Sequence, residues 1–229
     1  MRNEKIGIDI QRHQGIFDPS KFDGKKIAVI GAGAIGSKIL AGLIKLGLEG
    51  VHVYDFDVIE AHNIANQEFN AEQIGLAKVE AMSEYALRNN AHIITHNKAF
   101  TKKDSDENFN YVFLAVDSIK ARKDIVDWLT RKINLELIIE TRMGSDEVQF
   151  YMIRGKNQES DWLKTIDFDE ALVEVSACGS PISFGLVSDV CAALACNALV
   201  HWANGSLDYD KVSMFMYPLD IEATKYSEK

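Results

Sequence analysis

Two kinds of hydrophobic pattern alternate along the chain from residue 25 to residue 143. Short apolar runs predict buried strands, and apolar residues at helical spacing predict amphipathic helices. The predicted strands are 25–33, 51–57, 92–100, 110–117 and 136–143, and the predicted helices are 35–46, 74–90 and 118–134. Strands that alternate with helices favour an α/β fold, in which a mostly parallel sheet has helices on both faces.

The pattern changes after residue 143. Residues 147–154 and 211–219 predict two further strands, and residues 155–174 form a loose acidic segment. We expect these C-terminal strands to extend the sheet in the antiparallel direction.

The longest apolar run covers residues 181–205 and is long enough to suggest a membrane span. Asp189 interrupts this run, and a charge near the middle of a bilayer costs about 3 kcal/mol or more. We therefore predict a buried helix over residues 187–202 and no membrane partner.

The composition limits the classes of function. With 229 residues and no linker-like segment, the chain has the length of one domain. Its formal net charge of −9 argues against nucleic-acid binding, which needs a basic surface. The three cysteines include no CxxC pair, so we expect neither a structural zinc nor a disulfide framework. The N-terminus lacks the apolar core of a signal peptide, and we expect a cytoplasmic protein.

The clearest local motif follows the first predicted strand. Gly31, Gly33 and Gly36 form the pattern GxGxxG between a strand and a helix. The first glycine permits a tight turn, the second lets the backbone approach a phosphate, and the third lets the helix pack on the strand. Asp55 ends the second strand, where a carboxylate can accept the hydroxyls of a ribose. This Rossmann-like unit predicts a bound nucleotide, but it does not distinguish NAD from ATP.

The residues beyond Asp55 narrow the choice. In order along the chain they are Asp57, Asn63, Gln67, Lys78 in "IGLAK", and Asp117 and Arg122 in "VDSIKAR". Together with the glycine pattern, this ordered set resembles the ThiF/MoeB/HesA family, the adenylating domain of ubiquitin-activating-type enzymes. The resemblance extends over residues 25–205, most of the chain.

The resemblance implies ATP-dependent adenylation of a carboxylate. In that family the C-terminal glycine carboxylate of a small ubiquitin-fold protein becomes an acyl adenylate, and pyrophosphate leaves. Such a reaction brings two anions together, so it needs positioned cations and a metal more than a general base. The implied cofactors are ATP and Mg²⁺, and the implied partner is a ubiquitin-like or sulfur-carrier protein with a C-terminal diglycine. A ribosomal peptide or a modified tRNA base is the alternative substrate, since relatives activate both.

The resemblance also implies a role for each residue of the set. Lys78 would contact the phosphates and Asp117 would hold Mg²⁺, whereas Arg122 is expected to tie its helix to the sheet. A solvated helix lysine and an aspartate that only caps the next helix are the alternatives for the first two. The other nucleotide-binding residues would be Gly31, Gly33 and Gly36 at the phosphates, Asp55 at the ribose with Asp57 beside it, and Asn63 and Gln67, which bind the nucleotide or shape the loop.

One segment departs from the family pattern in its charge. The family's Asn-Leu-x-Arg-Gln, whose arginine contacts the ATP phosphates, is "NIANQ" here, so Asn66 replaces the arginine. Asparagine has neither the charge nor the donor geometry of a guanidinium. Either activity is weakened or another cation substitutes. Arg142, after the predicted strand 136–143, is our candidate, and an exposed structural arginine is the alternative.

Two further residues are assigned by looser matches. Arg12 in "RHQ" resembles a family arginine that reaches into the ATP site of the partner subunit, which implies a homodimer. Cys178 in "SACGSPISFG" resembles a cysteine that forms a thioester or acyl disulfide with the carrier in some members. Buried packing is the alternative for Cys178, and we expect Cys191 and Cys196 in the core.

The resemblance also suggests an organisation within one domain. Residues 1–24 would form an N-terminal arm, residues 25–142 a nucleotide-binding half, and residues 143–229 a carrier-binding half.

Two other functions remain open from the sequence. An NAD(P)-dependent oxidoreductase would share the glycine pattern and Asp55, but it leaves Lys78 and Asp117 unexplained. A weakened or inactive binding module of the same fold would bind ATP or the carrier without turnover, with Asn66 marking the lost catalysis.

Overall fold

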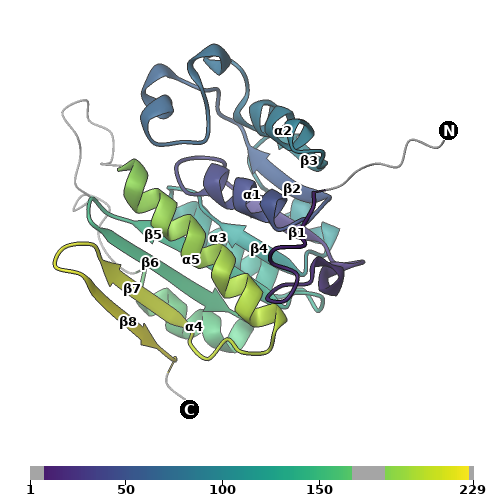
Figure 1. Ribbon diagram of the computed structural model, residues 1–229. Helices are drawn as coiled ribbons and strands as arrows, with labels where there is room; N and C mark the ends of the chain where they lie inside the picture. The colour runs from purple at the N-terminus through teal and green to yellow at the C-terminus, as the bar shows by residue number, and fades with distance from the viewer. Residues whose placement is uncertain (1–7, 167–183, 227–229) are drawn as a thin grey trace.

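The computed structural model describes residues 8–166 and 184–226, which build one eight-stranded sheet with the order β3-β2-β1-β4-β5-β6-β7-β8 (Figure 1). The parallel strands are β1 (Ile27–Ile30), β2 (Val51–Asp55), β3 (Ile93–Asn97), β4 (Tyr111–Leu114) and β5 (Leu137–Met143). The antiparallel strands are β6 (Glu147–Ile153), β7 (Lys211–Phe215) and β8 (Asp220–Thr224). The predicted fold class is confirmed.

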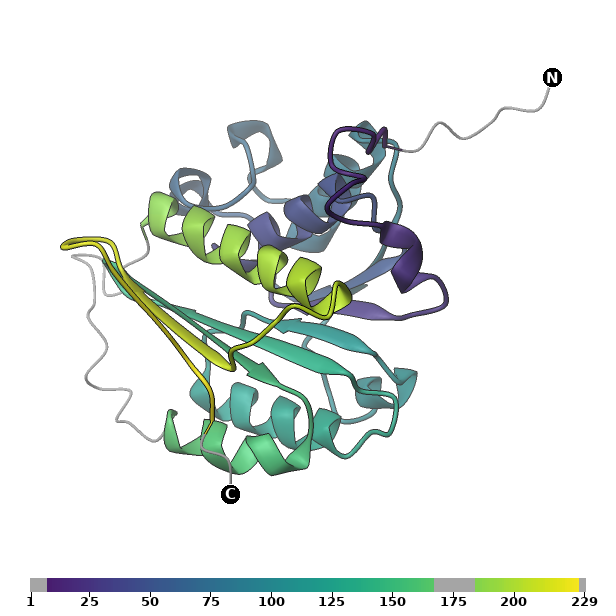
Figure 2. The ribbon, with the colours of Figure 1, turned by 60° about the horizontal axis from the view of Figure 1, so that its bottom comes forward.

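Helices cover both faces of the sheet (Figure 2). One face carries α1 (Gly36–Lys45), α2 (Lys78–Arg88) and α5 (Gly185–Ala203), and the other carries α3 (Ile119–Thr130) and α4 (Lys156–Lys164). Short 3-10 turns are η1 (Pro19–Phe22), η2 (Ala61–Ala65), η3 (Ala71–Gln73) and η4 (Asp104–Glu107).

The continuous apolar sequence of β1 follows from this layering. Ile27 and Val29 pack into the core beneath α1 and α5, and Ala28 and Ile30 pack into the core on the side of α3. Successive side chains of a strand point to opposite faces, so a strand covered on both faces is apolar throughout.

Helix α5 is long and apolar enough to cross a membrane by length and composition. In this structure it packs against α1, β5 and β6, with Val187, Cys191 and Leu199 buried. A Cβ added to Gly42 of α1 would lie 2.9 Å from the Sγ of Cys196, so the two helices approach each other closely. The predicted helix is present and packs on the sheet, with half of it buried.

Two elements were not predicted. The segment interpreted as loose and acidic contains α4, whose sequence is mostly polar and whose main anchor is the fully buried Trp162. Strand β8 pairs with β7 alone and has no buried residue, so its sequence shows no alternation. The predicted strand 211–219 is wrong beyond Phe215, where β7 ends.

The strand order places a switch point between β1 and β4. The chain runs from β1 outward through β2 and β3 and then returns to β4 on the other side of β1. The register pairs Ile30 with Leu114, so the carboxyl ends of both strands meet at one edge. Ligands of open α/β sheets bind in the crevice at such a point.

Two histidines pair on the neighbouring strands β2 and β3. Nδ1 of His52 on β2 lies 3.0 Å from Nε2 of His96 on β3, and the two rings are stacked. Burial lowers the pKa of His52 to about 4, helped by the nearby His96. Burial also lowers the pKa of His96.

We expect acid to destabilise the protein through this pair. Unfolded histidines take up protons near pH 6.5 and the folded pair resists them, so the free energy of unfolding should fall by about 2 kcal/mol from pH 7 to pH 5. In the double variant His52→Gln/His96→Gln, the free energy of unfolding should lose this part of its dependence on pH. Urea unfolding at pH 7, 6 and 5 measures the free energy of unfolding of the wild type and of the double variant. The same dependence on pH in the two proteins would contradict the prediction.

Candidate active site

The turn after β1 is shaped by close backbone packing. Gly31 has a φ of +92°, and a Cβ added to it would lie 2.7 Å from the carbonyl oxygen of Ala115. A Cβ added to Gly36 would lie 1.8 Å from the carbonyl oxygen of Gly31. The N–H of Ala115 donates to the carbonyl oxygen of Ile30 at 2.9 Å, which holds the end of β4 against the turn. The protein's own packing therefore requires both glycines.

Gly33 is different. A Cβ added there would meet nothing within 4 Å among the described residues, and its φ lies outside the left-handed region. The described part of the chain gives no internal reason for a glycine at this position. Gly33 precedes the first turn of α1, where backbone N–H groups point outward without helical partners. A phosphate that closely approaches the backbone would explain the missing side chain.

Asp55 ties the end of β2 to the glycine turn. Its Oδ2 accepts the N–H of Ala32 at 2.6 Å, and its Oδ1 accepts the N–H of Asp57 at 2.8 Å. A carboxylate has about four lone-pair positions, so ribose hydroxyls can still donate to it. The side chain is fixed beside the turn before any nucleotide arrives.

Lys78 continues this series of contacts. It begins α2, and its Nζ lies 2.8 Å from Oδ2 of Asp57. Its N–H donates to the carbonyl oxygen of Asp57 at 3.0 Å. The Lys78 side chain is only 8% exposed, which does not fit a solvated helix lysine. Contacts thus run from the turn through Asp55 and Asp57 to a nearly buried ammonium.

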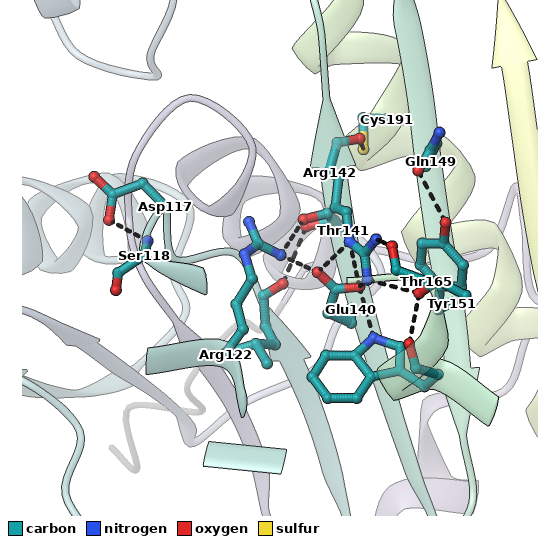
Figure 3. Close-up of polar contacts among 12 residues, drawn as sticks. Asp117, Ser118, Arg122, Glu140, Thr141, Arg142, Gln149, Tyr151, Thr165 and Cys191 are labelled. Carbon is teal, nitrogen blue, oxygen red and sulfur yellow. Dashed lines mark hydrogen bonds and ion pairs between the residues drawn. The ribbon is translucent and has the colours of Figure 1, made fainter. Parts of the chain in front are cut away.

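Asp117 lies on the other side of the turn. It lies two residues after Ala115, the residue that contacts Gly31, and it is exposed. Its Oδ1 accepts the N–H of Ser118 at 2.8 Å (Figure 3), while the hydroxyl of Ser118 caps α3 by accepting the N–H of Ala121. Since Ser118 is the cap, the helix-cap alternative does not account for Asp117.

The position of Asp117 fits a magnesium ligand. Mg²⁺ usually binds one or two carboxylates together with phosphate oxygens and water. In residues 8–166 and 184–226, no group of three or more His, Cys, Asp or Glu side chains is placed to hold a metal ion. A metal at Asp117 would therefore depend on oxygens from the nucleotide.

The segment from Asn63 to Gln67 packs beside the turn. Asn63 shapes its own loop, because its Oδ1 accepts the N–H of Glu60 at 2.9 Å. The buried Oδ1 of Asn66 and Oε1 of Gln67 have no hydrogen-bond partner among the described residues.

Ser37 joins this segment to the turn, a role that no sequence signal indicated. Its hydroxyl donates to the carbonyl oxygen of Gly33 at 2.7 Å and accepts the N–H of Glu68 at 3.1 Å. Ser37 is fully buried. The hydroxyl of Ser37 therefore links the first turn of α1 to Glu68, the residue that follows the segment 63–67.

Glu140 organises a buried charge cluster near Asp117 (Figure 3). This fully buried carboxylate binds Nη1 of Arg122, Nε of Arg142 and Nε1 of Trp162. Burial alone would raise the pKa of Glu140, but the two guanidinium groups outweigh it and hold the pKa below its usual value. Arg122 also donates to the carbonyl oxygen of Thr141, which confirms that it ties α3 to the sheet.

Arg142 does not occupy the place that the substitution hypothesis requires. Besides Glu140, its guanidinium donates to the carbonyl oxygen of Thr165 at 2.7 Å and lies 4.2 Å from the ring centre of Tyr151. These contacts hold the guanidinium of Arg142 in the Glu140 cluster, beside β5 and β6 (Figure 3). The structure therefore favours a structural role for Arg142, although the residue is largely buried and not exposed as the alternative stated.

Arg12 is exposed and lies away from its own chain's glycine turn. The neighbouring Ile10 lies against Gly47, just beyond the C-terminal end of α1. The ten residues of α1 span about 15 Å, and the turn is at the opposite end. A role for Arg12 in a partner's site stays a prediction, which a single chain does not test.

The cysteines fall into two groups. Cys178 lies outside the described residues, so its predicted role stays a prediction. Cys191 and Cys196 are buried, and burial raises the pKa of both thiols to about 12. Such thiols stay protonated at neutral pH. Both cysteines pack in the core, as predicted.

Comparison with known proteins identifies the family. Residues 16–227 match the family described as ThiF. The chain belongs to the ThiF family. This confirms the resemblance on which the assignment of Lys78 and Asp117 depends.

The sequence relatives of this ThiF-family chain are activating enzymes by name. It is 31% identical over 129 residues to the NEDD8-activating enzyme E1 catalytic subunit of Arabidopsis thaliana, which covers 50% of this chain and 28% of the relative. It is 31% identical over 102 residues to the ubiquitin-like modifier-activating enzyme 5 of Drosophila willistoni, covering 44% of this chain and 25% of the relative. The matched region thus spans about a quarter of each relative.

Two solved structures share the fold at low identity. MccB of E. coli, solved with AMPCPP and MccA, superposes with a TM-score of 0.70 at 17% identity, covering 92% of this chain and 66% of that one. PaaA superposes with a TM-score of 0.72 at 16% identity, covering 95% of this chain and 68% of that one.

The glycines allow a direct test of the turn. Gly33→Ala should leave the free energy of unfolding within about 0.5 kcal/mol of the original, because the added Cβ meets no described atom. It should weaken ATP binding by about tenfold or more, because the Cβ takes the space of a phosphate. Gly36→Ala is the matched control and should lose about 3 kcal/mol of stability through the clash with Gly31.

Chemical denaturation and calorimetric ATP titration measure these two properties. If Gly33→Ala binds ATP as tightly as the original protein, the turn is not a phosphate site.

Proposed function

We propose that this chain is an ATP-dependent adenylyltransferase. It activates the C-terminal carboxylate of a ubiquitin-like or sulfur-carrier protein as an acyl adenylate. The observation that carries the proposal is the series of contacts from the glycine turn through Asp55 and Asp57 to Lys78, with the space above Gly33 left open. Membership of the ThiF family supports it, and leaves an NAD(P)-dependent oxidoreductase without support.

The reaction is a displacement at the α-phosphorus of ATP. A carboxylate oxygen of the carrier forms the new bond to this phosphorus. The bond to the bridging oxygen breaks, and pyrophosphate leaves with the electron pair. Negative charge accumulates on the pyrophosphate, so catalysis depends on cations and backbone N–H groups placed in advance.

The chain's own residues divide this work. The N–H groups of the glycine turn hold phosphate oxygens, and Asp55 orients the ribose. Lys78 neutralises charge on the phosphates, and its salt bridge with Asp57 holds the ammonium in place. Asp117 would hold Mg²⁺, which supplies further charge neutralisation when it is bound.

The carrier would dock on the C-terminal half of the sheet. Phe215, Tyr217, Leu219 and Ile221 of the β7–β8 hairpin expose large apolar side chains, and a cluster of this kind marks an interaction surface. The relatives named for NEDD8 and SUMO activation, and MccB solved with MccA, support a protein or peptide carboxylate as the substrate. We further propose a cytoplasmic homodimer in which Arg12 serves the partner's site, and turnover reduced by Asn66.

ATP–pyrophosphate exchange with candidate diglycine-ended proteins tests the proposal. The wild type should exchange only when the right carrier is present. Lys78→Ala should lower exchange by about 100-fold or more, the loss typical of removing one charge-stabilising group. Arg88→Ala is a matched control, because Arg88 lies on the same helix in an exposed pair with Glu84 and should leave exchange unchanged.

The outcomes separate the alternatives. Tight ATP binding without exchange for any diglycine-ended protein or peptide would identify a binding module and contradict the proposed activity. Full exchange by Lys78→Ala would remove the lysine from the mechanism.

A further inference from the structure

Lys38 holds an unusual position for a helix lysine. It lies in the first turn of α1, two residues after Gly36, and its side chain is only 11% exposed. Its Nζ donates to the carbonyl oxygen of Gly185 at 2.8 Å and pairs with Oδ1 of Asp189 at 2.6 Å. The ammonium is therefore held between the glycine-turn end of α1 and the beginning of α5, which lie side by side (Figures 1 and 2).

Gly185 also contacts the end of η2 and the residue that follows it. A Cβ added to Gly185 would lie 2.9 Å from the carbonyl oxygen of Ala65 and 3.5 Å from the Cα of Asn66. The hydroxyl of Ser188 lies 3.4 Å from the carbonyl oxygen of Asn66. Lys38 and Asn66 thus approach the same residue, Gly185, from α1 and from the 63–67 segment.

The polar groups of this cluster are incompletely satisfied. The buried amide oxygens of Asn66 and Gln67 have no hydrogen-bond partner among the described residues. An ammonium has three N–H donors, and within the described part of the chain Lys38 contacts two oxygens of α5. If the ammonium of Lys38 moved from Asp189 toward the turn, its donors would be available to an anion.

The charge of the site favours a further cation besides Lys78 and the magnesium ion expected at Asp117. Asp55, Asp57 and Asp117 surround the glycine turn, whereas Lys78 is the ammonium already placed among them. ATP adds a strongly anionic triphosphate to this excess of carboxylates. Carboxylates and phosphates that lie close together repel one another unless cations offset their charge. Lys38 carries an ammonium in the first turn of α1, next to the glycine turn.

We propose that Lys38 is a second phosphate-binding cation of the ATP site, held by Asp189 in the free protein and transferred to the triphosphate when ATP binds. The inference rests on the proposed function and names a cation that offsets part of the charge missing at Asn66. The Asp189 side chain is 55% exposed, so its carboxylate can return to solvent when a phosphate takes its place beside the ammonium. The flexible stem of lysine permits the transfer, which a rigid guanidinium pair would resist.

Three single variants test the proposal by calorimetric ATP titration with Mg²⁺ present. Lys38→Met keeps the apolar stem and should weaken ATP binding by about tenfold. Asp189→Asn releases the ammonium and removes a negative charge, so it should strengthen binding by about twofold to fivefold. Lys45→Met, at the other end of α1, is the matched control and should bind ATP like the wild type.

The Asp189 variant distinguishes this role from a structural one. If Lys38 only fastens α1 to α5, breaking the salt bridge from either side should have the same effect on ATP binding. Equal effects of Lys38→Met and Asp189→Asn would therefore overturn the proposal. Thermal unfolding of each variant shows whether the fold is kept, and Asp189→Asn retains the test if Lys38→Met does not fold.

A rescue experiment locates the ammonium. Asn66→Arg places a guanidinium at the residue that shares Gly185 with Lys38, so the double variant Lys38→Met/Asn66→Arg should recover ATP affinity to within about threefold of the wild type. If a folded double variant does not recover ATP affinity, a cation at residue 66 cannot replace the Lys38 ammonium, which would contradict the proposed position.

The two proposals fail in different ways. A wild type that does not bind ATP overturns the proposed function and this inference together. A wild type that binds ATP, with Lys38→Met binding equally well, overturns only the role of Lys38.

Discussion

The close approach of two backbones at the carboxyl ends of β1 and β4 determines where every other part of the candidate site lies. Gly31 turns the chain against the carbonyl group of Ala115, and Gly36 brings the first turn of α1 onto Gly31. A side chain at either glycine would force β4 or α1 away. The gap between the two strand ends, which the strand order makes the switch point of the sheet, would then lose its shape. The functional side chains come from the loops that leave this edge.

The fold holds the two carboxylate positions by different means. Asp55 accepts the backbone N–H of Ala32 in the turn, so its position follows directly from the packing of β1 on β2. Asp117 is exposed, and its position depends on α3, which Arg122 fastens to the buried Glu140. Removing one partner of a buried ion pair leaves an uncompensated charge, which typically costs about 3–5 kcal/mol. The Glu140 cluster therefore supports the position of Asp117 through α3.

The sequence predicted the parts of the molecule that depend on local patterns. The parallel strands and α1 to α3 have apolar periods of their own, and the glycine pattern places the turn between strand and helix. Helix α4 was missed because one buried tryptophan, Trp162, holds a polar helix, and β8 because an exposed edge strand needs no alternation.

The roles of the remaining residues depend on contacts between segments that lie far apart in the sequence. Arg142 has the right place in the sequence to reach the sheet edge, but Glu140 and Thr165 hold its guanidinium in the interior. Ser37 and Lys38 carry no signal, because their importance comes from Glu68 and from Gly185, residues that only folding brings near. A lysine next to a glycine turn looks like a solvated helix residue until the start of α5 is placed over it. The contact that buries Lys38 also joins the nucleotide-binding half of the chain to the half expected to bind the carrier. Under the proposal for Lys38, ATP binding would release Asp189 at the beginning of α5, so this helix would link nucleotide binding to the second half of the chain.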